Sequence, residues 1–232
     1  DRIAAIMEKN QEGSTVLMKS LEHRRSLRHL LQLFPISERL AVLQSRDSDG
    51  KSILSMATID PMLIRVILSE LPEDERILAL LDRYNNKSVM QLLAENTKYS
   101  KFWPMLLSMI PLETRAALLQ DRDELGASIL HLVADCAKLL SLILNLLPAD
   151  QRLDAVLNQN NDGNNVLHIA AKFTNSVIVI LEVLQEDERL AAITDLDSNG
   201  NSTVHWAAYT PKSLQQLLLF YPAYQRLAVV KA

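Results

Sequence analysis

The sequence predicts an all-α repeat solenoid of about six 37-residue units, with three short helices per unit and little or no β-hairpin. Arginines, mostly in an E-R-L or Q-R-L context, recur at spacings of 37, 37, 39, 37, 37 and 37 residues. Prolines usually stand four residues before them, and glycines usually eleven residues after them. Chance does not produce such matched series. The arginines are Arg2, Arg39, Arg76, Arg115, Arg152, Arg189 and Arg226.

Each unit opens with a turn that leads into a short first helix. The recurring glycine, replaced by Asn86 in the third copy, suits a turn that needs a positive φ angle. Asp47, Asp123 and Asp197 stand three residues before the glycine in their copies and can brace the turn. A good helix N-cap follows each turn, so a first helix is expected there. These N-caps are Thr15, Ser52, Ser88, Ser128, Asn165 and Ser202.

A second and a third helix complete the unit. The second begins at dipeptides such as Asp60-Pro61, since proline is tolerated at the first helical position. Its apolar residues recur at helical spacing, as at Leu140 and Ile143. The third is predicted where acidic residues precede strong helix formers, as in residues 73–81. No segment shows sustained alternation of apolar and polar residues, so essentially no sheet is expected.

Two segments resemble the ankyrin consensus D-x-x-G-x-T-P-L-H-x-A-A. Residues 123–131 read D-E-L-G-A-S-I-L-H, and residues 197–208 read D-S-N-G-N-S-T-V-H-W-A-A. The chain departs from the consensus because its proline is replaced and because the unit is longer than the usual ~33 residues. The resemblance implies that the short third helix replaces the β-hairpin finger of ankyrin repeats. The chain is thus similar to the divergent ankyrin-like effectors that intracellular bacteria deliver into host cells.

The resemblance implies a non-catalytic scaffold that binds a partner, most plausibly a eukaryotic host protein, through a concave face. The position four residues after the consensus histidine commonly faces the concave side of ankyrin repeats. A solvated surface without a partner is an equally good interpretation of any one of these residues. The contact candidates are Glu22, Ile59, Glu95, Asp135, Lys172 and Tyr209.

The third copy and the first copy add further binding candidates. Tyr99 and Trp103 belong to an aromatic cluster beside the 39-residue spacing, and they are either a binding anchor or part of the core. Arg24, Arg25 and Arg28 lie in the one dense basic stretch of the chain. This stretch suits an acidic partner or phosphoinositide head groups, although a charge run is more often a solvated helix face.

The histidines and the cysteine do not predict a catalytic, cofactor or metal site. His131, His168 and His205 occupy one slot in three successive copies, where helices lie roughly 8 to 10 Å apart, whereas zinc needs nitrogens at about 2.1 Å. The resemblance implies instead that this histidine links neighbouring turns. Cys136 is expected to be a buried, inert thiol. Glycine-rich nucleotide-binding loops are absent from the sequence.

Composition narrows the partner classes. The net charge of -4 gives no global reason to bind nucleic acid, and charged residues interrupt every hydrophobic run before it reaches the ~20 residues of a membrane span. A single cysteine fits a reducing compartment, so a cytosolic protein is expected. Delivery into a host cytoplasm is implied only by the resemblance to effectors.

Residues 1–232 are expected to form a single array within a longer protein, because the chain begins and stops in the same phase of the repeat. Two other functions remain open on the sequence. The array is alternatively a substrate-recruiting or targeting arm of a larger enzyme, or a structural spacer without a partner.

Overall fold

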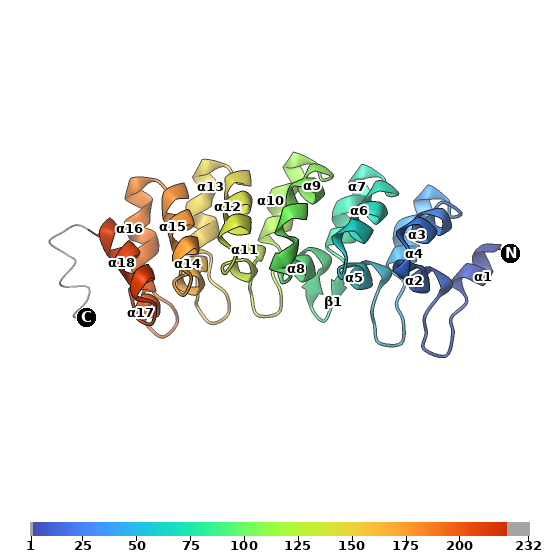
Figure 1. Ribbon diagram of the computed structural model, residues 1–232, viewed down its shortest axis with the longest axis horizontal. Helices are drawn as coiled ribbons and strands as arrows, with labels where there is room; N and C mark the ends of the chain where they lie inside the picture. Colours follow the sequence, from blue (N-terminus) through green and yellow to red (C-terminus); the bar gives the residue numbers. More distant parts are fainter. Residues whose placement is uncertain (1, 222–232) are drawn as a thin grey trace. The chain divides into compact units, whose positions relative to one another are not determined.

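The computed structural model describes residues 2–221 and is mostly helical, as predicted (Figure 1). The chain divides into two compact parts, residues 1–121 and residues 122–232, called the N-terminal part and the C-terminal part below. Arg226, the last of the recurring arginines, lies outside the described residues.

The N-terminal part begins with α1 and then repeats a turn followed by helices three times. Two 3₁₀ helices, η1 and η2, extend helices of the first copy, and a third, η3, precedes α9. Its elements are α1 (Arg2–Met7), α2 (Val16–Lys19), η1 (Ser20–Glu22), α3 (Arg24–Leu31), η2 (Ile36–Glu38), α4 (Arg39–Leu43), α5 (Ile53–Ala57), α6 (Pro61–Ser69), α7 (Glu73–Leu80), β1 (Arg83–Tyr84), β2 (Lys87–Ser88), α8 (Val89–Ala94), η3 (Thr97–Phe102), α9 (Trp103–Ser108) and α10 (Leu112–Gln120).

The C-terminal part follows the same order of turn, first helix, second helix and third helix. Its elements are α11 (Ile129–Leu132), α12 (Ala137–Leu146), α13 (Ala149–Leu157), α14 (Val166–Ala170), α15 (Thr174–Val183), α16 (Glu186–Thr194), α17 (Thr203–Ala207) and α18 (Pro211–Phe220).

Helices of the same kind pack against one another in neighbouring copies. In the N-terminal part α5 lies between α2 and α8, and α7 contacts α4 and α10. In the C-terminal part α15 contacts both α12 and α18. Leucines such as Leu54 and Leu167 are buried in these contacts, and full burial of one such side chain is worth about 1.5–3 kcal/mol. The core therefore runs between successive copies within each part.

The turns have the predicted geometry. The recurring glycines all have positive φ, and Gly163, at φ 75°, shows why no side chain fits there. A Cβ on Gly163 would overlap the backbone nitrogen of Ser198 in the next turn. The Asp47 carboxylate accepts hydrogen bonds from the backbone N–H groups of Asp49 and Lys51, at 2.9 and 2.8 Å. The Asp47 turn is thus fixed by its own side chain, and the Gly163 turn packs closely against the turn that follows it.

The third copy corrects the expectation of essentially no sheet, because it contains a two-residue hairpin. β1 and β2 pair antiparallel, with Arg83 opposite Ser88 and Tyr84 opposite Lys87. Asn85 and Asn86 between them have φ angles of 49° and 61°, which is the twist that a tight two-residue hairpin turn requires. Asparagine tolerates this left-handed region better than most residues, which explains why the glycine is dispensable here.

The 39-residue spacing of the third copy has its origin after the hairpin. The proline that precedes the third helix lies 20 residues after the N-cap in the second copy (Ser52 to Pro72) and 23 residues after it in the third (Ser88 to Pro111). The 3₁₀ helix η3 takes up the additional residues, while the hairpin turn is one residue shorter than the other turns.

The recurring arginines cap the end of the second helix. Arg76 Nε donates to Leu68 O at 2.9 Å, and its Nη1 donates to Met109 O of the following copy at 3.0 Å. Arg39 likewise donates to Phe34 O and to Glu70 O, at 3.2 and 2.9 Å. A carbonyl at a helix C-terminus lacks an intrahelical donor, so the guanidinium satisfies it. The carbonyls of Ile110, Leu147 and Leu181 accept in the same way from Arg115, Arg152 and Arg189.

Candidate functional site

The histidine slot has the structural role that the ankyrin resemblance implies in two copies. His168 is buried, its Nδ1 accepts from the backbone N–H of Asn165 at 3.1 Å, and its Nε2 donates to Asp195 O at 3.1 Å. His131 Nε2 also donates to a carbonyl of the following copy, Asn164 O, at 3.1 Å. Burial lowers the pKa of both imidazoles, so the neutral form is favoured. In His205, Nδ1 likewise accepts a hydrogen bond from the backbone N–H of Ser202 at 3.1 Å, but the side chain is exposed.

The six predicted contact positions all lie on the surface, five of them shortly after the first helix and Glu22 at the end of its 3₁₀ extension η1. Ile59 and Tyr209 are the most informative, because 73% and 90% of these large side chains are exposed. The other four are charged and exposed, namely Glu22, Glu95, Asp135 and Lys172. Lys87 forms an ion pair with Glu95. The structure brings two of the six together, since Lys172 and Tyr209 line one hollow of the C-terminal part.

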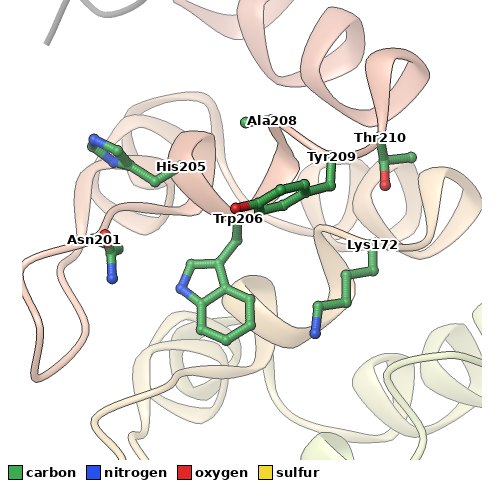
Figure 2. Close-up of a pocket in the computed structure, with 7 residues that line it drawn as sticks. All are labelled: Lys172, Asn201, His205, Trp206, Ala208, Tyr209 and Thr210. Atoms are coloured by element: carbon green, nitrogen blue, oxygen red, sulfur yellow. The ribbon is translucent and has the colours of Figure 1, made fainter.

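This C-terminal hollow is an open cavity of about 840 Å³ between the fifth and sixth copies (Figure 2). Residues just after α14 and α17 form two of its sides, and the end of the turn before α17 forms another. Figure 2 shows the Tyr209 ring above the indole of Trp206. Its lining includes the side chains of Lys172, Asn201, His205, Trp206, Tyr209 and Thr210.

A chain of polar contacts fixes the indole in this hollow. Trp206 Nε1 donates to Asp197 Oδ2 at 3.0 Å, and the Lys172 ammonium lies 4.8 Å from the centre of the Trp206 ring, where a cation–π attraction acts. Burial raises the pKa of the Asp197 carboxyl, but the hydrogen bonds from Asn201, Trp206 and Asn199 outweigh it and lower the pKa to about 2. The ionised carboxylate therefore orients the indole and stays behind it.

A second, smaller hollow lies between the second and third copies of the N-terminal part. It has a volume of about 390 Å³, and Ile59, Tyr84 and Met56 contribute to its lining. The Lys51 ammonium lies 5.8 Å from the centre of the Tyr84 ring. Each part thus has a hollow in which a lysine stands over an aromatic ring beside an exposed, large side chain.

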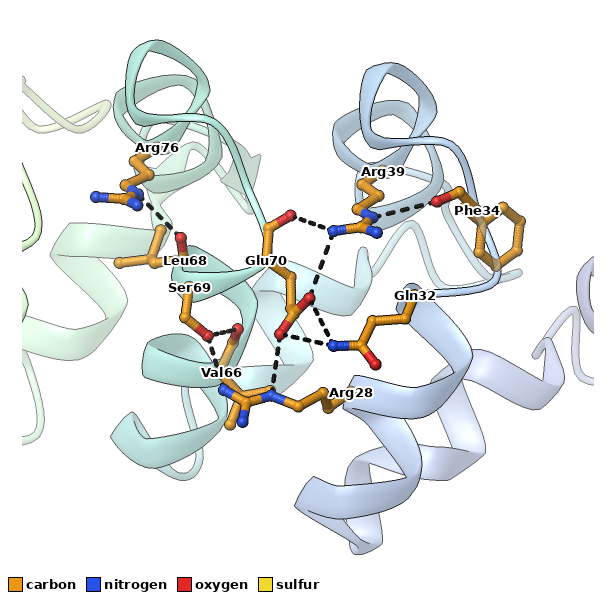
Figure 3. A network of polar contacts seen from close by, with 9 residues as sticks. All are labelled: Arg28, Gln32, Phe34, Arg39, Val66, Leu68, Ser69, Glu70 and Arg76. Carbon is orange, nitrogen blue, oxygen red and sulfur yellow. Dashed lines mark hydrogen bonds and ion pairs between the residues drawn. The ribbon is translucent and has the colours of Figure 1, made fainter.

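The basic stretch is largely engaged inside the N-terminal part. Arg24 Nε donates to Asp60 Oδ2 at 2.9 Å. Arg28 Nε lies 3.0 Å from Glu70 Oε1, and Gln32 and Arg39 reach the same carboxylate (Figure 3). These contacts join the first copy to the second. Of the three arginines predicted to bind an acidic partner, Arg24 and Arg28 already hold carboxylates, while the exposed Arg25 does not share in this network.

The aromatic cluster of the third copy belongs mainly to the fold. Trp103 is only 1% exposed, so its side chain offers no surface to a partner and fills the core, which was the alternative interpretation. Tyr99 is half-buried, and its hydroxyl donates to Ile59 O of the second copy. Its ring also meets Phe102 edge to face, with the centroids 6.3 Å apart. Tyr99 therefore links two copies beside the exposed Ile59.

Two residues of the hollows were missing from the sequence-based candidates. Trp206 directly follows the histidine slot, where the other copies have Lys19, Met56, Leu92, Leu132 and Ile169. Tyr84 stands where all five other copies have the Asp or Asn that braces the turn, as at Asp47 and Asn160. In both cases the sequence offered a signal for a binding residue. An aromatic side chain stands at a repeat position where the other copies have a different type of residue.

The described residues contain neither a metal-binding cluster nor a membrane-spanning helix. Within residues 2–221, no three His, Cys, Asp or Glu side chains gather closely enough to hold a metal ion. In the same part of the chain, no helix has the length and hydrophobicity to cross a bilayer. Cys136 is half-buried rather than buried as expected, because it lies at the N-cap of α12 beside an open hollow.

Comparison with known proteins identifies the architecture. No family model and no curated protein matches the sequence. Among solved structures, the ankyrin repeat domain of Bcl-3 is similar with a TM-score of 0.68 and 16% identity, over 91% of this chain and 85% of that one. The human ASB11 ankyrin repeat domain gives 0.65 and 13%, over 94% and 87%.

A third similar structure is the complex of the predatory endopeptidase Bd0816 from Bdellovibrio bacteriovorus with the immunity protein Bd3460. One of its chains gives a TM-score of 0.59 and 14% identity, over 90% of this chain and 98% of that one. At these identities the likeness concerns the fold alone. Together with the turns, caps and linking histidines, it shows that the chain has an ankyrin-repeat fold.

Proposed function

We propose that this chain is a non-catalytic scaffold that binds a partner protein through the surface that follows the first helix of each copy. The observation that supports this most is Tyr209, a large aromatic side chain that is 90% exposed on the rim of the C-terminal hollow. Aromatic residues are enriched at the centres of protein interfaces, where their burial contributes much of the binding energy. Ile59 offers the same kind of anchor in the N-terminal part.

The proposal includes an array of about six 37-residue copies whose equivalent positions form one concave binding face. The resemblance to effectors suggests a eukaryotic host protein as the partner. The Bdellovibrio complex, in which an immunity protein accompanies an endopeptidase, suggests a bacterial peptidase as another partner class for this fold. A cytosolic location is part of the same proposal.

A pull-down with the chain as bait, from eukaryotic and bacterial lysates and with mass-spectrometric identification, tests the scaffold. The test variant combines Glu95→Arg, Asp135→Arg, Lys172→Glu and Tyr209→Ala. All four side chains are exposed, so the variant should fold with an unchanged circular dichroism spectrum. A partner that the natural chain retains should be lost.

The matched control combines Asp154→Arg and Leu196→Ala, which alter an exposed aspartate of α13 and an exposed leucine outside the hollows. This control should retain the partner. Equal retention by both variants would place the contact surface elsewhere, and capture of no specific protein from either lysate would favour a spacer.

A further inference from the structure

The lysine of the C-terminal hollow has no acidic partner within the described residues. Lys19, Lys51 and Lys87 each form an ion pair, with Glu12, Asp49 and Glu95 in turn. Lys172 forms none within residues 2–221, and its ammonium is held only over the Trp206 ring. A cation–π contact leaves most of the ammonium N–H donors pointing away from the ring, so they remain able to bind an acceptor.

The one carboxylate behind the indole cannot serve as that acceptor. Asp197 Oδ1 accepts from the backbone N–H groups of Asn199 and Asn201, at 2.9 and 2.8 Å. Its Oδ2 accepts from Trp206 Nε1 at 3.0 Å and from Asn201 Nδ2 at 3.2 Å. Only 6% of Asp197 is exposed. All of its hydrogen-bonding capacity is therefore used within the turn.

The hollow is lined by a positively charged side chain and by aromatic rings, without any acidic residue. No Asp or Glu lines it, so Lys172 supplies its formal charge. Trp206 is half-buried and fixed by Asp197, while Tyr209 projects beside it and is largely exposed. A fixed indole loses little conformational entropy when a ligand covers it, which favours binding of an apolar group at this place.

We propose that the C-terminal hollow recognises a segment of the partner protein in which a carboxylate side chain is adjacent to a large apolar side chain. The carboxylate binds the Lys172 ammonium, and the apolar side chain packs on Trp206 and Tyr209. This inference rests on the proposed scaffold function and adds the chemistry of the ligand to it. A single ammonium without a neighbouring arginine is a weak site for phosphate, which usually requires several donors.

The first test uses capped tetrapeptides and nuclear magnetic resonance of the whole chain. The chain has two tryptophans, and because Trp103 is buried, its indole N–H resonance is an internal reference for that of Trp206. The probes are Gly-Glu-Phe-Gly and Gly-Phe-Glu-Gly, titrated to about 10 mM because short peptides bind weakly. At least one should shift the Trp206 resonance and leave that of Trp103 in place.

Two analogues separate the charge from the apolar contact. Replacing Glu by Gln should weaken binding about threefold to fivefold, as expected for an exposed ion pair. Replacing Phe by Ala should weaken it about tenfold. Inorganic phosphate, titrated over the same range, should not shift the resonance. An equal shift by phosphate, or no shift by either Glu-Phe probe, overturns the inference.

Variants of Lys172 distinguish ligand binding from a structural role. Lys172→Met keeps the apolar stem over the indole and should abolish the preference for Glu over Gln, while Lys172→Glu should reverse it in favour of Lys-Phe probes. Lys138→Glu, an exposed lysine outside the hollow, should leave the preference unchanged. A Glu preference that survives in Lys172→Met contradicts the inference.

The proposed scaffold is judged separately by the pull-down. A partner that is lost with Tyr209→Ala but retained by Lys172→Glu leaves the scaffold intact and rejects the acidic ligand. A Glu-Phe preference in the peptide titrations with no protein captured supports the ligand chemistry and counts against the scaffold.

Discussion

At the scale of single residues, one position performs the same task with two kinds of side chain. His168 accepts a backbone N–H through Nδ1 and donates to the next turn through Nε2. In the third copy, Gln91 Oε1 accepts from Ser88 N–H at 2.8 Å and Gln91 Nε2 donates to Asp121 O at 3.2 Å. An acceptor and a donor at the right separation are therefore sufficient, and the basicity of histidine is not needed.

This equivalence predicts the effect of changing His168. His168→Gln should preserve stability at neutral pH within about 1 kcal/mol, whereas His168→Ala should lose about 1–3 kcal/mol because Asn165 N–H and Asp195 O are left unsatisfied. Urea unfolding followed by circular dichroism measures both. If His168→Gln and His168→Ala lower the free energy of unfolding equally, the two hydrogen bonds do not explain the stability contributed by residue 168.

The same residue predicts a pH dependence. Burial lowers the folded-state pKa of His168 and His131 below the ordinary value of 6.5, so the unfolded chain takes up protons first. The stability that the two histidines contribute is complete above about pH 6.5 and is lost as the pH falls through and below that value. His168→Gln should reduce the slope of unfolding free energy against pH between about pH 7 and 5. An unchanged slope would show that other groups cause it.

At the scale of elements, the third helix is held by the arginine near its start. Arg76 lies in α7 and satisfies carbonyls at the end of α6 and at Met109, just beyond α9. The planar guanidinium of Arg76 donates hydrogen bonds in two fixed directions at once. A lysine ammonium on its flexible side chain would hold the same two acceptors less firmly. Arg76 thus joins α7 to the ends of both α6 and α9.

Substitution of Arg76 should therefore be costly. Arg76→Ala is expected to lower the free energy of unfolding by about 1–3 kcal/mol, and Arg76→Lys should restore only part of it. Thermal and urea unfolding of the whole chain measure the loss. Arg65→Ala, which removes an exposed arginine from α6, is the control and should change stability by less than about 0.5 kcal/mol. Equal losses at both positions would contradict the capping role.

The elements also show what the sequence could and could not predict. The turns, the N-caps and the order of three helices were readable because each depends on residues within one copy, such as Gly163 and Asp47. The hairpin at Tyr84 was not, since two-residue strands are too short to show alternation. The neutralisation of Arg28 by Glu70 was also hidden, because the acid lies in the following copy. Lys172 and Tyr209 were identified, but Trp206 between them was not.

At the scale of the whole molecule, each compact part has its own core. Leu54 and Ile67 are buried in the N-terminal part, and Ile143 and Ile180 in the C-terminal part. In repeat proteins stability is approximately the sum of terms within copies and between adjacent copies. The stability of each part should accordingly come mainly from contacts inside it.

Residues 122–232, produced alone, are therefore expected to fold. Their far-ultraviolet circular dichroism should be helical, and urea should unfold them cooperatively with a free energy of about 5 kcal/mol. The Trp206 indole should still bind Asp197, which its N–H resonance reports. A fragment with a disordered spectrum would show that the C-terminal part depends on residues 1–121.

The bond from Arg76 to Met109 O has a consequence for how the gene can change. The donor belongs to one copy and the acceptor to the next, and the same is true of Arg39 and Glu70. Deleting or duplicating a segment of one full period rebuilds an equivalent junction, and the longer third copy keeps the junction because η3 takes up its additional residues. Unequal recombination among the first three copies can thus lengthen or shorten the protein in whole periods, while the bond made by Arg39 and Arg76 to the following copy is rebuilt.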